Sequence, residues 1–249
     1  SKNAAFPNGL ANSSGAVGKN LLFSGGGMGS GEFDVSHFSQ EVLLQPGLFV
    51  NRALKDWYFT SKFKGGLIDF LFEHANPIRR ANALKWEDDK LIFGQKLQDK
   101  IFQTFTTTRV LNFEIFNDWM PNDNCFVSVD EKYKDKYGIP VANVRIGAHP
   151  EDVRVGEFLA TKAVQLLKRM GAKNITYAIS PLPSQNLQAG GCRFGDNPKK
   201  HVLNRYCQSH DIPNLFVTDG SFMPTGGSVP YTWTIYANAF RVAEYIKTL

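Results

Sequence analysis

The pattern of apolar and polar residues predicts an antiparallel sheet in the middle of the chain. Ile68, Phe70 and Phe72 occupy every second position of residues 66–72, which is the period of a strand with one buried face. Three further strand-like runs, residues 111–116, 125–130 and 141–147, follow one another with only polar turns between them. Consecutive strands joined by short turns pair antiparallel, and the alternation leaves one face solvated or lining a cavity.

Helical periodicity predicts the layer that packs on this sheet. Residues 150–170 are the clearest case, because Glu151 and Asp152 lie in the first turn, basic residues lie in the last, and Gly171 follows as a stop signal. Residues 94–105 and 232–247 also place apolar side chains on one helical stripe. Residues 174–179 predict another strand, and residues 37–59 have helical spacing that is interrupted at Pro46. We therefore expect a mixed fold of the α/β or α+β class.

Composition and charge predict a globular protein without nucleic-acid binding, a disulfide framework, a metal site or a membrane helix. The chain has 249 residues, 43% of them hydrophobic, which is enough for one large domain or two small ones. Its 28 basic and 23 acidic residues are scattered and give a net charge of +5, so nucleic-acid binding is not predicted. Three cysteines without a C-x-x-C spacing and five histidines without ligand spacing predict no disulfide framework and no metal site. No apolar run reaches the roughly 20 residues of a membrane helix, so we expect a soluble protein of the periplasm or the cytoplasm.

The last quarter of the chain, from Gln188 to Leu249, carries three separated motifs. The first, Q-A-G-G-C-R-F-G, is a glycine hairpin around Cys192 and Arg193. The second, N-L-F-V-T-D-G-S, begins at residue 214 as an apolar run that predicts a strand, and the carboxyl end of a strand in an open α/β sheet is a usual place for ligand contacts. The third, G-G-S-V-P-Y-T-W-T-I, opens the final helix, whose N-terminus favours anionic atoms.

Together these motifs resemble the C-terminal end of the glucose–methanol–choline (GMC) flavin oxidoreductases. That family carries H-x-x-G-[TG]-C-R-x-G, then N-L-x-V-x-D-G-S-x-x-P, then G-x-N-P-T-x-T-I and a final helix. The resemblance covers about residues 187–246, and a weaker likeness extends to residues 9–21 and 137–141. It implies FAD as the cofactor and adds the C-terminal segments of an FAD-binding domain to the expected fold.

The resemblance also implies that the chain is the C-terminal half of a longer protein. The family begins with a G-x-G-x-x-G unit that holds the ADP part of FAD, and this chain has none. The glycine-rich stretch of residues 25–31 precedes no helix-forming run, so we expect a flexible loop there, as in the rest of residues 1–34. The implied organisation is a loop-rich segment at 1–36, a substrate-binding domain with the antiparallel sheet at 37–180, and a flavin-site segment at 181–249.

Six residues occupy family positions that the resemblance places near the flavin. Asp219 and Gly220 match the residues that approach the diphosphate and ribityl chain of FAD, and Ser221 follows them. An aspartate in this place could instead cap the next turn, and the sequence leaves that alternative open. Pro230, Tyr231 and Thr232 begin the final helix, where the N-terminal dipole would stabilise the reduced isoalloxazine, and Thr232 is also expected to cap that helix.

The sequence departs from the family pattern at both catalytic positions. Leu187 stands where the family has its catalytic histidine, and Pro230 stands where a second histidine or an asparagine belongs. Neither side chain can transfer a proton, so the catalytic base is unknown. The base comes from elsewhere, or the chain is a degenerate member, or the alignment is offset by one residue. Asn186, Gln188 and Tyr231 flank the two positions and are the candidates for orienting a substrate hydroxyl.

The expected function is therefore that of an FAD-dependent oxidoreductase that oxidises a CH–OH group of a sugar or another alcohol, with hydride transfer to flavin N5. The alternative is a GMC-fold binding or structural protein that has lost the catalytic base. The expected partners are the small-molecule substrate, the N-terminal FAD-binding half of the same protein and an electron-accepting subunit. This chain by itself is expected to be inactive.

Overall fold

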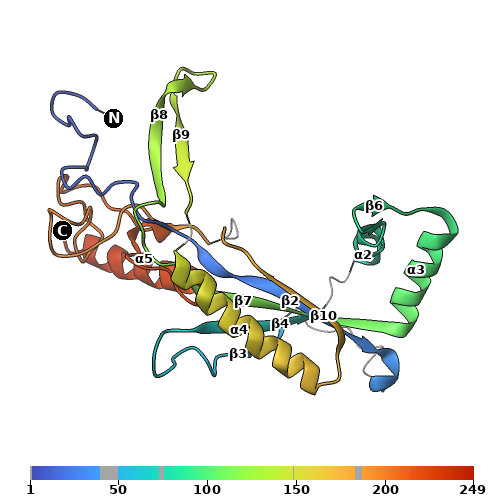
Figure 1. Cartoon of the computed structure of the whole chain (residues 1–249). Coiled ribbons are helices and arrows are strands. Elements are labelled where there is room, and N and C mark those ends of the chain that lie inside the picture. Colours follow the sequence, from blue (N-terminus) through green and yellow to red (C-terminus); the bar gives the residue numbers. More distant parts are fainter. Residues whose placement is uncertain (1, 40–49, 73–75, 148, 183–186) are drawn as a thin grey trace.

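The computed structural model describes residues 2–39, 50–72, 76–147, 149–182 and 187–249, and its centre is a five-stranded antiparallel sheet (Figure 1). The strands, in spatial order, are β10 (Lys173–Ile179), β2 (Ser24–Asp34), β7 (Thr108–Asp118), β4 (Gly66–Phe72) and β3 (Val50–Leu54). The predicted mixed fold class and its antiparallel pairing are confirmed.

The glycine-rich stretch is a strand of this sheet, so the prediction of a flexible loop was wrong. Strand β2 pairs with β7 along its whole length, from Ser24 opposite Asp118 to Asp34 opposite Thr108. A Cβ atom at Gly29 would lie 2.3 Å from a ring carbon of Phe113. The glycines therefore leave the space that the neighbouring strand's aromatic rings occupy, and this packing overrides the weak strand propensity of glycine.

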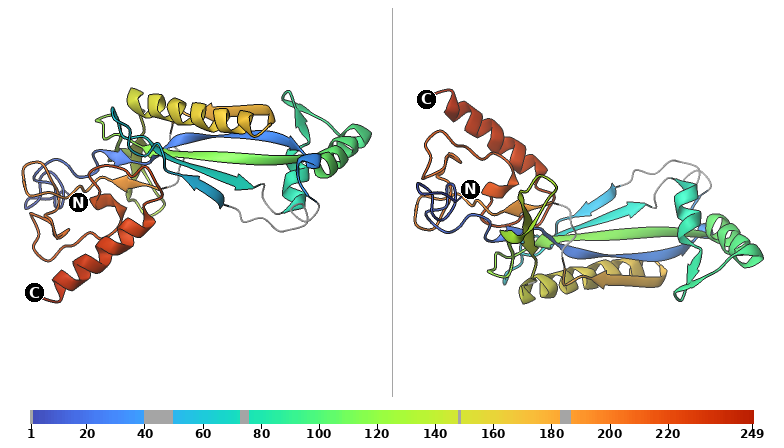
Figure 2. Two further views of the ribbon diagram at one scale, coloured as in Figure 1. Left: turned by 90° about the horizontal axis from the view of Figure 1, so that it is seen from below. Right: turned by 90° about the horizontal axis from the view of Figure 1, so that it is seen from above.

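Helix α4 (Pro150–Arg169) covers one face of the sheet, as Figure 2 shows. The predicted helix is confirmed, and His149 caps it with a ring nitrogen that accepts a hydrogen bond from the backbone N–H of Glu151. The side chains buried between helix and sheet alternate along the strands, as the sequence pattern predicts: Phe33, Ile68, Phe70, Phe113, Ile115, Val155, Leu159, Ala160, Ala163 and Leu167.

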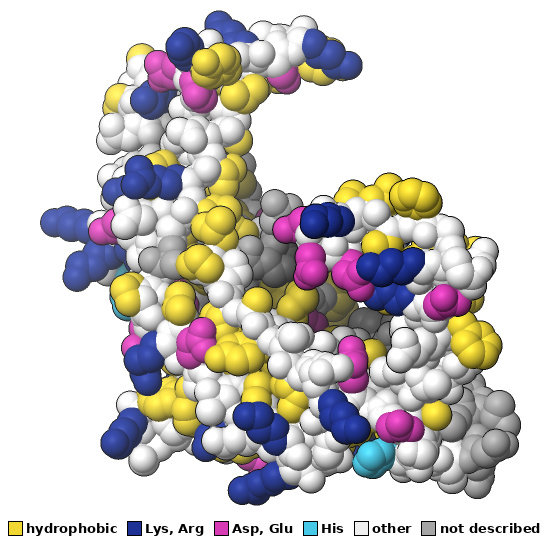
Figure 3. Space-filling model, turned by 45° about the vertical axis from the view of Figure 1, so that its right-hand side comes forward, with side chains coloured by type: hydrophobic (Ala, Val, Ile, Leu, Met, Phe, Trp, Pro, Cys, Tyr) yellow, Lys and Arg dark blue, Asp and Glu magenta, His cyan; other side chains and the backbone are white. Residues whose placement is uncertain are grey.

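The hairpin of β8 (Phe126–Lys134) and β9 (Pro140–Arg145) stands apart from this sheet (Figures 1 and 3). The sequence predicts one antiparallel sheet from three consecutive runs, whereas β7 joins the five-stranded sheet and β8 forms a separate two-stranded sheet with β9, with one isolated bridge from Phe126 to Lys19. Several large side chains of the hairpin are exposed, among them Val129, Tyr133, Tyr137 and Ile139. Two strands alone bury too little apolar surface to form a core, which explains this exposure.

An arm extends from the far end of the sheet (Figure 1). It consists of α2 (Pro77–Ala83), the short strands β5 (Trp86–Glu87) and β6 (Lys90–Leu91), and α3 (Gly94–Thr107). The predicted helix at 94–105 is confirmed, although Phe102, which the pattern places on the buried stripe, is exposed. A one-turn 3-10 helix, η1 (Val35–His37), follows β2.

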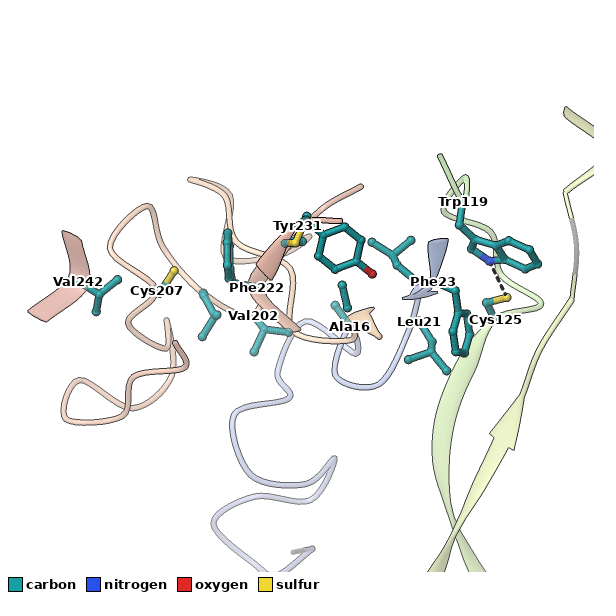
Figure 4. Close-up of a cluster of buried hydrophobic side chains, with 14 residues drawn as sticks. Ala16, Leu21, Phe23, Trp119, Cys125, Val202, Cys207, Phe222, Tyr231 and Val242 are labelled. Atoms are coloured by element: carbon teal, nitrogen blue, oxygen red, sulfur yellow. Dashed lines mark hydrogen bonds between the residues drawn. The ribbon is translucent and has the colours of Figure 1, made fainter. Parts of the chain in front are cut away.

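The C-terminal body is a second hydrophobic core at the opposite end of the sheet (Figure 4). It contains β1 (Leu21–Leu22), β11 (Ala189–Gly190), the 3-10 helix η2 (Gly220–Phe222) and α5 (Thr232–Ile246). The predicted final helix is confirmed. The strand predicted from residue 214 to 218 is wrong, because Phe216 forms only an isolated bridge with Gln208 and its neighbours follow the surface of the core.

The first 36 residues connect both parts of the molecule. Strand β1 pairs with β11 of the C-terminal body, and β2 pairs with β7 and β10 of the main sheet. The division into segments at 1–36, 37–180 and 181–249 stays a prediction. None of the helices in the described ranges combines the length and the apolar run that crossing a lipid bilayer requires.

Candidate functional site

The three C-terminal motifs, which are separate in sequence, meet in space. The backbone N–H of Cys192, in the first motif, donates to the carbonyl of Ser221, in the second, at 2.9 Å. At Gly220 a Cβ atom would lie 3.0 Å from the carbonyl oxygen of Gln188 and 3.1 Å from Cδ1 of Ile235, in the third motif. Gly220 therefore lies where all three motifs touch, and any larger residue would push them apart.

Asp219 caps the short helix η2 in this structure. Its side chain is exposed, accepts a hydrogen bond from the backbone N–H of Ser221 at 2.8 Å and also bonds the Ser221 hydroxyl. This is the turn-capping arrangement that the sequence left open. A cap and a ligand contact are compatible for an exposed carboxylate, so the role of Asp219 toward FAD stays a prediction.

The N-terminus of α5 differs from the prediction. Tyr231, and not Thr232, is the N-cap residue, and no side chain caps the helix within the described part of the chain. Thr232 is exposed on the first helical turn. The backbone N–H groups of this turn and the positive end of the helix dipole are therefore not satisfied by a capping oxygen, which is the situation that favours an anionic ligand atom.

Two buried hydroxyl groups next to this helix start lack hydrogen-bond partners among the described residues. They are Oγ of Ser228, which is fully buried, and Oη of Tyr231, whose residue is 2% exposed. Figure 4 shows Tyr231 among the apolar side chains of the C-terminal core. A buried polar group without a partner costs about 1–3 kcal/mol. Burial also raises the pKa of the Tyr231 phenol above its ordinary value, so the phenol stays protonated and is available as a donor. An acceptor-rich group such as the flavin ring system fits this environment.

None of the family's catalytic positions carries a base among the described residues. Leu187 has a backbone φ of 58°, which is unusual for leucine, and its side chain packs against the C-terminal core. Pro230 is exposed and has no proton to exchange. Gln188 lies against Gly220 through its carbonyl oxygen, and Asn186 lies outside the described residues.

The hairpin residues of the first motif are structural. Burial, followed by the negative charge of Asp219, raises the pKa of the Cys192 thiol, so this cysteine is not an activated nucleophile. Arg193 donates through Nε to the carbonyl of Lys200 at 3.2 Å and thereby holds the following loop.

Two carboxylates outside the C-terminal motifs form a cross-strand pair in the main sheet. Asp69 and Glu114 lie directly opposite each other on β4 and β7. The sequence contained a signal for them, because each interrupts a strand whose other residues are mostly apolar or amide. The alternation could not show that the two would be neighbours, since the pairing register of these strands is set by the fold.

Comparisons with known proteins identify the family of this chain. The family model described as GMC oxidoreductase, for the family's C-terminal domain, matches residues 121–239. The chain is 30% identical to 2-methyl-1,2-propanediol dehydrogenase of Mycolicibacterium austroafricanum, over 97% of this chain and 43% of the relative. It is 27% identical to the large subunit of fructose dehydrogenase of Gluconobacter japonicus, over 96% of this chain and 42% of that subunit.

A solved structure shows the same fold. A variant of formate oxidase from Aspergillus oryzae, studied for modification of its FAD, superimposes with a TM-score of 0.59 at 13% identity. The superposition covers 94% of this chain and 47% of the oxidase. The chain thus spans less than half the length of the proteins that it matches. FAD is the cofactor of this family, as expected, and the chain belongs to the GMC oxidoreductases.

Proposed function

We propose that the whole protein is an FAD-dependent oxidoreductase that oxidises a CH–OH group of a sugar or another alcohol. The observation that carries this proposal is the convergence of three family motifs at Gly220, together with the buried, unpartnered hydroxyls of Ser228 and Tyr231 at the start of α5. Bound FAD would supply the hydride acceptor, at flavin N5.

This chain's residues would hold and polarise the flavin. The uncapped N-terminus of α5 would stabilise the negative charge that the isoalloxazine gains on reduction. Ser228 and Tyr231 would donate hydrogen bonds toward the ring system, and Pro230 and Thr232 would shape the backbone there. Gly220 lies against Ile235 of α5, and Asp219, Gly220 and Ser221 would approach the ribityl and diphosphate groups.

The catalytic base is the open point of the mechanism. Leu187 is apolar and faces the core, and the raised pKa of Tyr231 makes it a donor, unsuited to accept a proton at neutral pH. Gln188 and Asn186 could orient a substrate hydroxyl without accepting its proton. We expect the base to come from outside the two family positions.

An electron-accepting subunit is a proposed partner. The support is the large subunit of fructose dehydrogenase, whose name implies further subunits. The other proposed partner is the N-terminal FAD-binding part of the same protein, because the chain matches less than half of each relative. By itself the 249-residue chain is expected to be inactive.

The test is the reduction of the FAD-loaded full-length protein by alcohols without oxygen. We expect sugars or small alcohols to bleach the flavin absorbance within seconds to minutes. The position of Leu187 offers a matched variant: because its side chain packs against the core, Leu187→His should not accelerate bleaching, and faster bleaching would show that this position reaches the substrate.

A second candidate is a flavin-binding protein that has lost catalysis. The apolar residues at both catalytic positions favour it. Failure of a broad panel of sugars and alcohols to reduce the bound flavin, while dithionite reduces it completely, would support this candidate and contradict the enzyme.

A further inference from the structure

The five-stranded sheet has one face covered by α4 and an opposite face, here called the open face. Figure 2 shows the open face between the C-terminal body at one end and the arm of α2 and α3 at the other. Strand alternation and register place these residues on it: Met28, Ser30, Ala53, Leu67, Asp69, Leu71, Asn112, Glu114, Phe116, Thr176 and Ala178. Asp69 and Glu114 are the charged residues of this set; Glu32 and its register partner Lys173 follow on the same face toward the far end of β2.

The two carboxylates form a directly opposed cross-strand pair. Asp69 of β4 is the register partner of Glu114 of β7, which places their Cβ atoms about 4.5–5.5 Å apart. Asp69 is only 9% exposed, and its Oδ1 is buried without a hydrogen-bond partner among the described residues. Glu114 is half-buried and is the member of the pair that a ligand reaches first.

Nothing in the described part of the chain neutralises this pair. Neither carboxylate forms an ion pair there, and the row of register partners from Ala178 to Ala53 that contains them has no lysine, arginine or histidine. Burial raises the pKa of Asp69, and burial together with the charge of Asp69 raises the pKa of Glu114. Two like charges directly opposite each other destabilise a sheet, so the arrangement calls for an outside partner.

The pair lies in a row of the sheet that begins next to the C-terminal end of β10. One row of register partners runs across the sheet from Ala178 through Met28 and Glu114 to Asp69. Adjacent strands are about 4.8 Å apart, so Glu114 lies about 10 Å from Ala178. Strand β10 ends one residue later, at Ile179, and the chain then leads to the motif segment that begins at Leu187.

The geometry points to a binding site for the ammonium group of an amino alcohol, formed by Asp69 and Glu114 on the open face. The inference rests on the proposed function and adds to it that the alcohol substrate carries a positively charged amine. The ammonium donates hydrogen bonds to both carboxylates and cancels the charge that the pair leaves uncompensated. A neutral hydroxyl supplies the donor but not the charge. A hard metal ion needs about six oxygen ligands, and the described residues hold no cluster of three or more acidic or metal-binding side chains.

The test compares three sugars with the FAD-loaded full-length protein. Glucosamine carries an ammonium group, whereas glucose and N-acetylglucosamine share its ring without that charge. Binding is measured by calorimetry without oxygen, so that the result does not depend on turnover. We expect glucosamine to bind at least tenfold more tightly than either neutral sugar.

Matched variants locate the effect. Glu114→Gln and Asp69→Asn keep size and shape, and each should weaken glucosamine binding at least tenfold while changing glucose binding less than threefold. The control is Glu32→Gln, which removes a carboxylate on the same face about 13 Å along β2 from the row of Glu114. It should leave both sugars unchanged, which excludes a general effect of net charge.

The outcomes separate the two proposals. Equal binding of the three sugars, or equal losses for charged and neutral sugars in the variants, would overturn the ammonium site. Glucosamine binding that depends on Asp69 and Glu114 without flavin bleaching would keep the site and count against the oxidoreductase. Thermal melting checks folding, and both variants should melt no lower than the parent because each removes a like-charge repulsion.

Discussion

The sheet with α4 and the C-terminal body differ in how completely they bury their apolar side chains. The sheet and α4 bury a continuous set of apolar side chains against each other, with Phe113, Leu159 and Leu167 at or near zero exposure. Helix α5 of the C-terminal body, in contrast, leaves Trp233 83% and Phe240 76% exposed. The same body holds the unpartnered hydroxyls of Ser228 and Tyr231.

The difference shows which part depends on something outside this chain. Large exposed aromatic side chains on one helix mark a surface that another element covers. Buried donors without partners mark a site that a ligand completes. The apolar core between the sheet and α4 is thus complete within this chain, whereas the flavin-site body is expected to be finished by FAD and by the N-terminal part of the protein.

The largest expected effect concerns FAD affinity. The isolated 249-residue chain should bind FAD weakly or not at all, because it provides only part of the site. The full-length protein should bind at least a thousandfold more tightly, which corresponds to about 4 kcal/mol. Flavin fluorescence quenching measures both. A nanomolar dissociation constant for the isolated chain, roughly −12 kcal/mol, would contradict the claim that its site is incomplete.

The second prediction compares the two regions with one kind of substitution. Phe113→Ala, in the core under α4, should lower the free energy of unfolding by about 3–5 kcal/mol. Phe240→Ala, on the exposed face of α5, should change it by less than about 0.5 kcal/mol in the isolated chain. Urea unfolding of the two variants and the parent gives both values. Similar losses at the two positions would mean that the face of α5 is already covered.

The third prediction concerns Asp152 at the start of α4. Burial raises its pKa to about 6, although the backbone N–H groups of Met120 and His149 donate to it. A carboxyl group whose pKa is higher in the folded state stabilises most when protonated, so its contribution is present below about pH 4 and is lost as the pH rises to about 6. The shift corresponds to at most about 3 kcal/mol, and solvent screening reduces it to on the order of 1–2 kcal/mol.

Denaturant unfolding between pH 4 and 8 checks this contribution. The stability of the parent relative to Asp152→Asn should fall by on the order of 1–2 kcal/mol between pH 4 and 6.5 and stay constant above that range. A difference between parent and variant that does not change with pH would show that Asp152 has no raised pKa.

The fourth prediction decides between the two roles of Asp219. If its carboxylate also positions FAD, Asp219→Ala in the full-length protein should weaken FAD binding by about 1–3 kcal/mol, or roughly tenfold to a hundredfold. If it only caps η2, the variant should lower the melting temperature equally with and without FAD. Melting curves of the apo and FAD-loaded forms, measured beside the parent, separate the two. The control is Asp34→Ala, because Asp34 caps η1 by accepting a hydrogen bond from the backbone N–H of Ser36, as Asp219 caps η2.

The sequence by itself determined the elements with strong local signals. Helix α4 begins and ends where its acidic first turn, basic last turn and Gly171 place it, because these signals act within a few residues of one another. The periodicity of apolar residues likewise predicted α5, β7 and β10. The C-terminal motifs also identified the family, because their spacing in the chain is itself the information.

Only the tertiary structure decided features that depend on distant contacts. The glycines of β2 form a strand because Phe113 and the backbone of β10 fill the space beside them, which no local propensity records. The apolar run before Asp219 has strand propensity but no partner strand, so it follows the core surface. Asp69 and Glu114 are neighbours because of the register of β4 against β7. That register is fixed by the intervening residues of both strands, which pack under α4.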